Sequence, residues 1–242
     1  MTASIADYYD NYWGPDGLNP PSNLTDDLRR FLTERTRGRV LDVGCGDGDT
    51  AGLFLKQLGR EYVGVDVSRA AVQSARSRDL DARQIDDAAS LPFDDNSFDS
   101  VVCIEVLEHL WMPNLAAAEI LRVLKPGGTF FATCPNVVYW RRRAGILLRG
   151  RWNPYGDDLS IEQPWRDPHV RFFTVGAMGR MVTGVGFKNV RVSGHDCTLL
   201  SGITQLPQAF RRLDSERFNR FLARRHPSVF ADRINVYAIK PH

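Results

Sequence analysis

The sequence of 242 residues lacks the features that define several common classes of protein. It has no apolar run of about 18 residues, so no transmembrane helix is predicted. Residues 1–10 contain no basic segment followed by an apolar one, and they are not predicted to be a secretory signal peptide. A net charge of only +2 gives no reason by itself to expect a membrane or a nucleic acid as a partner.

Cysteine is also scarce, and its spacing carries no motif. The four cysteines are far apart and form no C-x-x-C pair of the kind found in zinc and redox sites: Cys45, Cys103, Cys134 and Cys197. Three of them lie in apolar segments of strand length. We therefore expect buried thiols in a protein of the reducing cytoplasm.

A glycine-rich turn is the clearest positive feature of the chain. The apolar segment Val40–Val43 leads into Gly44-Cys45-Gly46-Asp47-Gly48, and a helical pattern follows from Thr50. Glycine permits positive φ without steric cost and lets a ligand approach the backbone closely. Asp49 stands where the dinucleotide fingerprint G-x-G-x-x-G would have its last glycine, which argues against NAD. The turn, with Asp42 before it, predicts a ligand crevice at the end of a buried strand.

Strands and helices are expected to alternate over residues 38–134. This order predicts a parallel sheet with helices on both faces and right-handed crossovers. The expected strands are Arg39–Val43, Tyr62–Asp66, Ala82–Ile85, Phe98–Ile104 and Thr129–Cys134. The expected helices are Leu24–Thr33 with Thr25 as a cap, Thr50–Leu58, Arg69–Arg78 with Ser68 as a cap, and Asn114–Leu124, which Pro126-Gly127-Gly128 closes.

The alternation stops after Cys134. Residues 135–174 are irregular and rich in proline, arginine and aromatic residues, and they are expected to form an inserted cap. Helical periodicity returns at Val175–Val182, the stretch 195–232 is expected to be partly helical, and strands are expected at Phe187–Val192 and Asn235–Lys240. The chain shows no repeat and no clear linker, which favours one α/β domain over 1–242. Its parts are the N-terminal lid and helices (1–37), the cofactor-binding core (38–134), the acceptor-binding insertion (135–174) and the C-terminal half of the sheet with its helices (175–242).

Two further acidic positions follow expected strands. Asp66 ends the second strand, where a carboxylate can accept hydrogen bonds from both hydroxyls of a ribose. Asp86 and Asp87 follow the third strand, where an acid can accept a hydrogen bond from the amine of adenine. Together with the glycine turn, these positions indicate a crevice for a nucleoside-containing ligand.

The motifs occur in the order found in one large family. V-L-D-V-G-C-G-D-G, V-G-V-D, D-A-A-S-L-P-F-D-D-N-S-F-D, E-V-L-E-H-L and I-L-R-V-L-K-P-G-G together resemble the class I S-adenosylmethionine-dependent methyltransferases, in particular their small-molecule branch. The resemblance covers residues 38–134. It implies a Rossmann-like seven-stranded mixed sheet, mostly parallel with an antiparallel last strand, with helices on both faces and an inserted cap.

The resemblance implies that S-adenosylmethionine is the cofactor and gives roles to the matched residues. On the methionine side, Gly44, Cys45 and Gly46 would lie against the cofactor, with Asp42 near its amino group. On the nucleoside side, Asp66 would hold the ribose and Val67 would lie under the adenine, while Asp87 and the backbone of Ala88 would bind the adenine amine. Ile104 and Glu105 would face the sulfonium.

The segment Glu105-Val106-Leu107-Glu108-His109 offers groups that could activate an acceptor hydroxyl. In a helix, its two glutamates and its histidine would share one face and could bind a divalent cation. The pattern resembles ubiquinone-biosynthesis O-methyltransferases and the 2′-O-methyltransferases of small RNAs, in which it holds magnesium or a related ion. In the RNA enzymes a downstream histidine completes the site, and the loosely similar D-P-H-V-R-F-F-T segment makes His169 the candidate here. The implied ligands of Mg²⁺ or Mn²⁺ are Glu105, Glu108, His109 and His169.

Other roles for these residues stay open. His109 or His169 could act directly as the catalytic base, because a hydroxyl is a poor nucleophile until it loses its proton. The E-x-x-E-H pattern also occurs in relatives without a metal, where its histidine caps or packs.

The acceptor is expected to contact the aromatic N-terminus and the insertion. Tyr12 and Trp13 belong to an aromatic segment that could form a lid over the site or a plain arm on the core. Trp140 and Arg143 lie in a basic run that resembles methyltransferases of glycan and natural-product sugar pathways. Arginine suits recognition of phosphate or carboxylate, although a solvated helix face is the alternative.

The sequence therefore predicts an O-methyltransferase for a small hydroxylated molecule, with a sugar-like, glycan-like or natural-product acceptor first. RNA ribose 2′-O-methylation is the alternative among enzymes, although the near-neutral charge argues against it. N-methylation of an amino sugar and a non-catalytic accessory role like that of MetW-type proteins of methionine biosynthesis are the others. A homodimer is left open.

Overall fold

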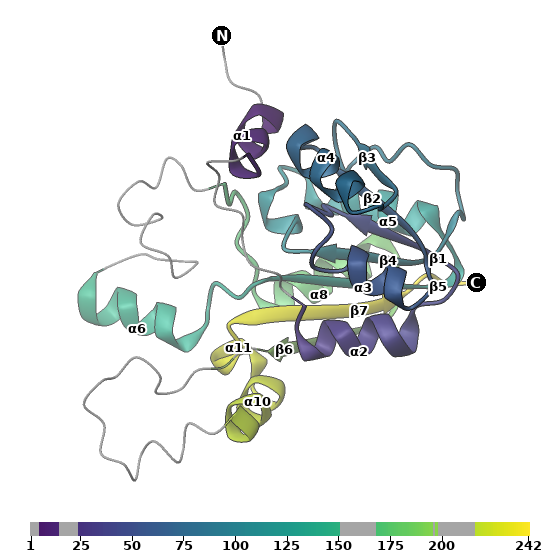
Figure 1. Ribbon diagram of the computed structural model, residues 1–242. Coiled ribbons are helices and arrows are strands. Elements are labelled where there is room, and N and C mark those ends of the chain that lie inside the picture. Colours follow the sequence, from purple (N-terminus) through teal and green to yellow (C-terminus); the bar gives the residue numbers. More distant parts are fainter. Residues whose placement is uncertain (1–4, 15–23, 151–167, 196, 198–215) are drawn as a thin grey trace.

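A seven-stranded sheet forms the centre of the molecule, with the strand order β3-β2-β1-β4-β5-β7-β6 (Figure 1). The computed structural model describes residues 5–14, 24–150, 168–195, 197 and 216–242. β7 runs antiparallel to both of its neighbours, and the other pairings are parallel. This confirms the predicted mixed Rossmann-like sheet. The strands are β1 (Arg39–Val43), β2 (Glu61–Asp66), β3 (Ala82–Gln84), β4 (Phe98–Ile104), β5 (Leu124–Pro135), β6 (Lys188–His195) and β7 (Arg233–Ile239).

Helices cover both faces of this sheet, because successive side chains of a strand point to opposite faces. Leu41 of β1 packs in one core cluster with Ile120 of α5. Its neighbour Val40 packs in the other with Leu32 of α2 and Leu55 of α3. The described helices are α1 (Ile5–Tyr12), α2 (Asp26–Arg35), α3 (Gly52–Gln57), α4 (Arg69–Ser77), the 3₁₀ helix η1 (Leu107–His109), α5 (Pro113–Val123), α6 (Trp140–Arg149), α8 (Val175–Val185), α10 (Glu216–Arg225) and α11 (Pro227–Phe230).

The predicted caps and thiols are confirmed. Thr25 Oγ1 accepts a hydrogen bond from Leu28 N (3.2 Å), and Ser68 Oγ accepts one from Ala71 N (3.1 Å), as N-cap residues do. All four cysteines are free and buried. These local signals therefore place the starts of α2 and α4 correctly.

Three segments differ from the prediction. β5 begins at Leu124 and includes Pro126-Gly127-Gly128, which form an irregularity in the register with β4 instead of a closing turn. Positive φ at Gly127 (76°) and the missing donor of proline suit such a bulge. α1 is a helix in the aromatic segment that was predicted as a lid or an arm, and α6 is a helix in the insertion that was predicted to be irregular.

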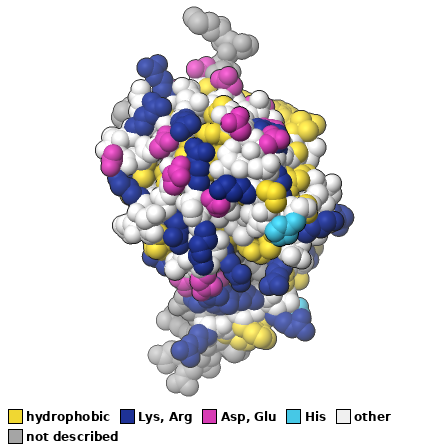
Figure 2. All heavy atoms as spheres, turned by 90° about the vertical axis from the view of Figure 1, so that its right-hand side faces the viewer, with side chains coloured by type: hydrophobic (Ala, Val, Ile, Leu, Met, Phe, Trp, Pro, Cys, Tyr) yellow, Lys and Arg dark blue, Asp and Glu magenta, His cyan; other side chains and the backbone are white. Residues whose placement is uncertain are grey.

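The surface agrees with the small net charge. Figure 2 shows Lys and Arg side chains next to Asp and Glu side chains on one face of the molecule. Oppositely charged side chains form ion pairs, such as Arg39–Glu61 (2.9 Å) and Lys125–Asp99 (2.8 Å). Among the helices in the described part of the chain, none has the length and apolar character needed to cross a bilayer.

Candidate functional site

A pocket of about 620 Å³ opens where the parallel strands end. Its lining includes the glycine turn, the ends of β2 and β3, the segment after β4, aromatic residues of α1, and His169. All ten residues predicted to bind the cofactor line this pocket: Asp42, Gly44, Cys45, Gly46, Asp66, Val67, Asp87, Ala88, Ile104 and Glu105. The fold therefore brings together positions that are spread over 64 residues of sequence, from 42 to 105.

The glycine turn needs its glycines. Gly44 (φ 74°) and Gly46 (φ 53°) have left-handed backbone conformations, which L side chains rarely adopt. The backbone N–H groups of Gly44 and Cys45 both donate to Val65 O (2.8 and 3.0 Å), which ties the turn to β2. A Cβ atom on Gly46 would lie 2.6 Å from Cζ2 of Trp13. The turn thus presents bare backbone to the pocket.

Asp42 lies under this turn, with an exposed fraction of 3%. The hydroxyl of Tyr62 donates a hydrogen bond to Asp42 Oδ2 (3.2 Å). Burial raises the pKa of the Asp42 carboxyl to about 7, although the Tyr62 hydrogen bond acts in the opposite direction. A cationic group beside Asp42 would favour the ionised carboxylate.

The raised pKa of Asp42 predicts a pH-dependent stability. Between its ordinary pKa of 3.8 and about 7, the folded state binds the proton that the unfolded state has lost. The free energy of unfolding that Asp42 contributes therefore falls as pH rises through this interval, by up to about 4 kcal/mol. We expect Asp42→Asn to be more stable relative to the wild type at pH 8 than at pH 5 in urea unfolding. An equal difference at both pH values would contradict the prediction.

Asp66 and Asp87, the two acids predicted to bind the nucleoside part of the cofactor, both line the pocket. Buried Asp66 accepts hydrogen bonds from Gly46 N and from Ser68 N, both at 2.9 Å, so it joins the glycine turn to the start of α4. Burial raises the pKa of Asp66, and these backbone hydrogen bonds oppose the shift. Asp87 is exposed at the other end of the pocket, where its Oδ1 accepts from Ala89 N (2.9 Å).

The segment after β4 is not the continuous helix that would place Glu105, Glu108 and His109 on one face. Only Leu107–His109 is helical, as a single 3₁₀ turn, and Glu105 has a left-handed φ of 56°. Glu105 Oε1 accepts from Thr133 Oγ1 (2.7 Å), and its Oε2 lies 3.3 Å from Nη1 of Arg233. Its carboxylate is thus bound to residues of β5 and β7. Glu105 does not belong to the group of potential metal ligands that includes Glu108 and His109.

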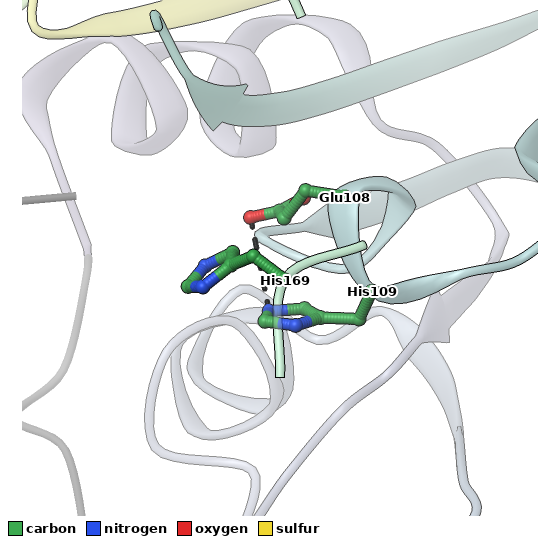
Figure 3. Close-up of side chains that lie close together, drawn as sticks. All are labelled: Glu108, His109 and His169. Carbon is green, nitrogen blue, oxygen red and sulfur yellow. Dashed lines mark ion pairs between the residues drawn. The ribbon is translucent and has the colours of Figure 1, made fainter. Parts of the chain in front are cut away.

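That group instead contains Glu108, His109 and His169, whose potential ligand atoms all lie within 4.8 Å of one another (Figure 3). The rings of His109 and His169 are 4.3 Å apart and inclined by 34°. Two backbone hydrogen bonds bring His169 to this place, because Val170 N and Arg171 N both donate to Glu108 O (3.0 and 2.9 Å). The structure therefore joins the two histidines that the motifs singled out.

The donor set fits a divalent cation. The Glu108 carboxylate is 1% exposed, and both of its oxygens are buried without a hydrogen-bond partner among the described residues. Burial raises the pKa of Glu108 well above its usual range, and the nearby charge of Glu105 adds to the shift. A bound cation would satisfy both oxygens and favour the ionised form. Imidazole donors suit first-row transition ions better than Mg²⁺, which prefers oxygen ligands.

The aromatic N-terminus lies against the same pocket. Tyr12 and Trp13 line it, and so does Tyr9, which belongs to the same aromatic segment but was not among the candidate acceptor-binding residues. The ring of Tyr9 meets His109 edge to face, with centroids 6.0 Å apart and planes at 85°. The spacing of residues 9, 12 and 13 places all three on one side of a helix, which is the signal that could have found Tyr9.

The two candidates on α6 are not brought to the pocket. Trp140 packs edge to face against Tyr139 (6.2 Å), and Arg143 donates to Ser228 O (3.1 Å) at α11. Neither belongs to the lining formed by the described residues. Arg233 does belong to it, and no sequence signal marked this residue.

Known proteins are similar to this chain in sequence and in fold. A family model described as a methyltransferase domain matches residues 41–132. The ubiquinone biosynthesis O-methyltransferase of Idiomarina loihiensis is 31% identical over 199 residues, covering 76% of this chain and 77% of the relative. Its counterpart in Alkalilimnicola ehrlichii is 36% identical over 128 residues, covering 48% of this chain, and the chain spans only about half (51%) of that relative's length. A SAM dependent methyltransferase from Archaeoglobus fulgidus has the same fold, with a TM-score of 0.60 at 20% identity over 88% of this chain and 91% of that one.

The strand order and the solved neighbour define an α/β protein with a Rossmann-like methyltransferase fold. The chain belongs to the S-adenosylmethionine-dependent methyltransferases.

Proposed function

We propose that the protein transfers the methyl group of S-adenosylmethionine to a hydroxyl of a small molecule. The observation that carries the proposal is that one pocket contains both the glycine turn with its two acids and the Glu108–His109–His169 cluster. A sugar-like, glycan-like or natural-product acceptor is the first candidate, on the sequence resemblance of the basic segment around residue 140, although Trp140 and Arg143 lie outside the described lining of the pocket. A phenolic hydroxyl is the second, because the similar proteins are named for ubiquinone biosynthesis.

The cofactor would lie along the floor of the pocket. Its methionine part would lie on the glycine turn with its amino group at Asp42, its ribose at Asp66 and its adenine between Val67 and Asp87. When bound, it supplies a methyl group on a positively charged sulfur, which needs alignment with a nucleophile more than further activation. The cluster at Glu108 would then face the acceptor.

The histidines of the cluster can take the proton of the acceptor hydroxyl. His109 or His169 would accept this proton, which would leave the electron pair of the acceptor oxygen free to receive the methyl group that the bound cofactor supplies. A divalent cation held by Glu108, His109 and His169 would lower the pKa of the acceptor hydroxyl instead. Tyr9, Tyr12 and Trp13 would exclude water from the reacting groups.

A screen for release of S-adenosylhomocysteine tests this proposal. The acceptors are hydroxylated sugars, phenols and amino sugars, each assayed with EDTA, with Mg²⁺ and with Mn²⁺. We expect turnover with at least one hydroxylated acceptor, a loss of activity in EDTA, and better recovery with Mn²⁺ than with Mg²⁺ because two of the donors are imidazoles.

Other outcomes of the screen point elsewhere. Full activity in EDTA would contradict the metal and leave the histidines as the base. Turnover of amino sugars only would favour N-methylation. Tight binding of S-adenosylmethionine without turnover of any acceptor, together with recovery of a stoichiometric protein partner, would favour the accessory role.

A further inference from the structure

A chain of hydrogen bonds connects α1 to the predicted cofactor turn. Asp10, near the end of α1, accepts two hydrogen bonds at Oδ1, from Ser68 Oγ (2.8 Å) and from Ala70 N (3.1 Å). Ser68 N donates in turn to Asp66 (2.9 Å), and Asp66 accepts from Gly46 N (2.9 Å). Three hydrogen bonds, through Ser68 and Asp66, therefore connect Asp10 to Gly46, although these two residues are 36 positions apart in sequence.

Asp10 also completes the cap of α4. The first N–H groups of a helix have no partner inside the helix. Ser68 Oγ satisfies Ala71 N, and Asp10 satisfies Ala70 N. The Ser68 hydroxyl donates its hydrogen to Asp10, so the lone pairs of the Ser68 oxygen remain available to accept from Ala71 N. A carboxylate at this position also interacts favourably with the helix macrodipole.

The helix that carries Asp10 lies at the surface. α1 has eight residues, and none of them is fully buried. Yet this helix places Tyr9 against His109, and Trp13, the residue that follows the helix, lies against Gly46. The position of these two rings over the pocket thus depends on how α1 is anchored.

We propose that Asp10 is a positioning residue that couples occupancy of the cofactor site at Asp66 to the placement of α1 over the pocket. The proposal rests on the proposed use of S-adenosylmethionine. A ligand that contacts Asp66 or the glycine turn stabilises one arrangement of Asp66 and Ser68, and this arrangement is the one to which Asp10 binds. Tyr9 and Trp13 are placed over the acceptor end as a consequence.

Calorimetry with S-adenosylhomocysteine tests the coupling. We expect Asp10→Ala to bind it about tenfold more weakly than the wild type, which corresponds to the loss of one helix cap. Asp10→Asn should stay within about threefold, because its amide oxygen can accept the same two hydrogen bonds. Asp7→Ala removes an exposed acid from the same helix and serves as the matched control, within about twofold of the wild type.

Cleavage by chymotrypsin reports on α1 itself, since Tyr8, Tyr9, Tyr12 and Trp13 are its targets. S-adenosylhomocysteine should slow cleavage at these residues several-fold in the wild type and in Asp10→Asn, but not in Asp10→Ala. Equal affinity and equal protection in Asp10→Ala and the wild type would overturn the coupling, as would a loss of affinity as large in Asp7→Ala. Failure of the wild type itself to bind S-adenosylhomocysteine would instead refute the proposed function, and the coupling with it.

Discussion

His169→Ala is expected to lower kcat for methyl transfer by about 10²–10⁴-fold, and His109→Ala by a similar factor. Both imidazoles belong to the Glu108–His109–His169 cluster in the pocket, with ring centroids 4.3 Å apart, and a divalent cation held there would need both of them as ligands. Affinity for S-adenosylhomocysteine should change by less than about threefold, because neither ring belongs to the glycine turn or its acids. Stopped assays with a substrate from the acceptor screen, together with calorimetry, measure the two effects.

Exposed His226 offers a control for the loss of an imidazole. It lies at the start of α11, outside the described lining of the pocket, and His226→Ala should keep the kcat of the wild type. A kcat for His169→Ala equal to that of His226→Ala would show that the cluster takes no part in the reaction.

Glu108→Gln distinguishes metal binding by the cluster from direct base catalysis by a histidine. Both oxygens of Glu108 are buried, and only the carboxylate can neutralise a cation between the imidazoles. If a metal is bound, Glu108→Gln should lose about as much activity as the histidine variants, and the Mn²⁺ concentration needed for half-maximal rate should rise at least tenfold. If a histidine is the base, this variant should retain most of its activity and show no dependence on Mn²⁺.

The core from residue 38 to residue 134 was predictable because its signals are local. Strand periodicity, the cap at Ser68 and the glycine turn each depend on residues close in sequence. Asp42, Asp66 and Asp87 could be placed at one edge because parallel strands end on the same side of a sheet. His169 could be joined to His109 only through a resemblance, because the backbone bonds between residues 170–171 and Glu108 are not visible in any periodicity.

The orientation of the Glu105 side chain could not be predicted from such local signals. Its carboxylate is oriented by Thr133 and Arg233, which are 28 and 128 residues further along the chain, and its left-handed φ breaks the helix that the E-x-x-E-H spacing suggested. Arg233 is the first residue of an ordinary strand, β7, and carries no motif. The role of Asp10 likewise depends on its distance from Ser68, which only the fold determines.

Gly44→Ala is expected to reduce the free energy of unfolding by about 2–4 kcal/mol, which corresponds to a fall in Tm of roughly 5–15 °C. Two causes add at this position. Its φ of +74° is costly for alanine, and the added Cβ would lie 2.2 Å from Cγ2 of Val106. Gly59→Ala is the matched control, because Gly59 has a similar φ of +67° and no atom within 4 Å of the added Cβ, so only the backbone cost of about 1 kcal/mol remains.

A double-mutant cycle with Val106→Ala isolates the steric cause. Shortening Val106 removes the atom that the new Cβ would strike, so Gly44→Ala/Val106→Ala should be more stable than the sum of the single variants by about 1–2 kcal/mol. Strict additivity in urea unfolding would mean that the turn and the segment after β4 do not press on each other. Since Val106 lies between Glu105 and the 3₁₀ turn of Glu108 and His109, the expected coupling means that the glycine at 44 fixes more than the floor of the cofactor crevice. It also sets the distance between the turn and the segment that carries Glu108 and His109. The double variant should therefore recover stability without recovering the wild-type kcat.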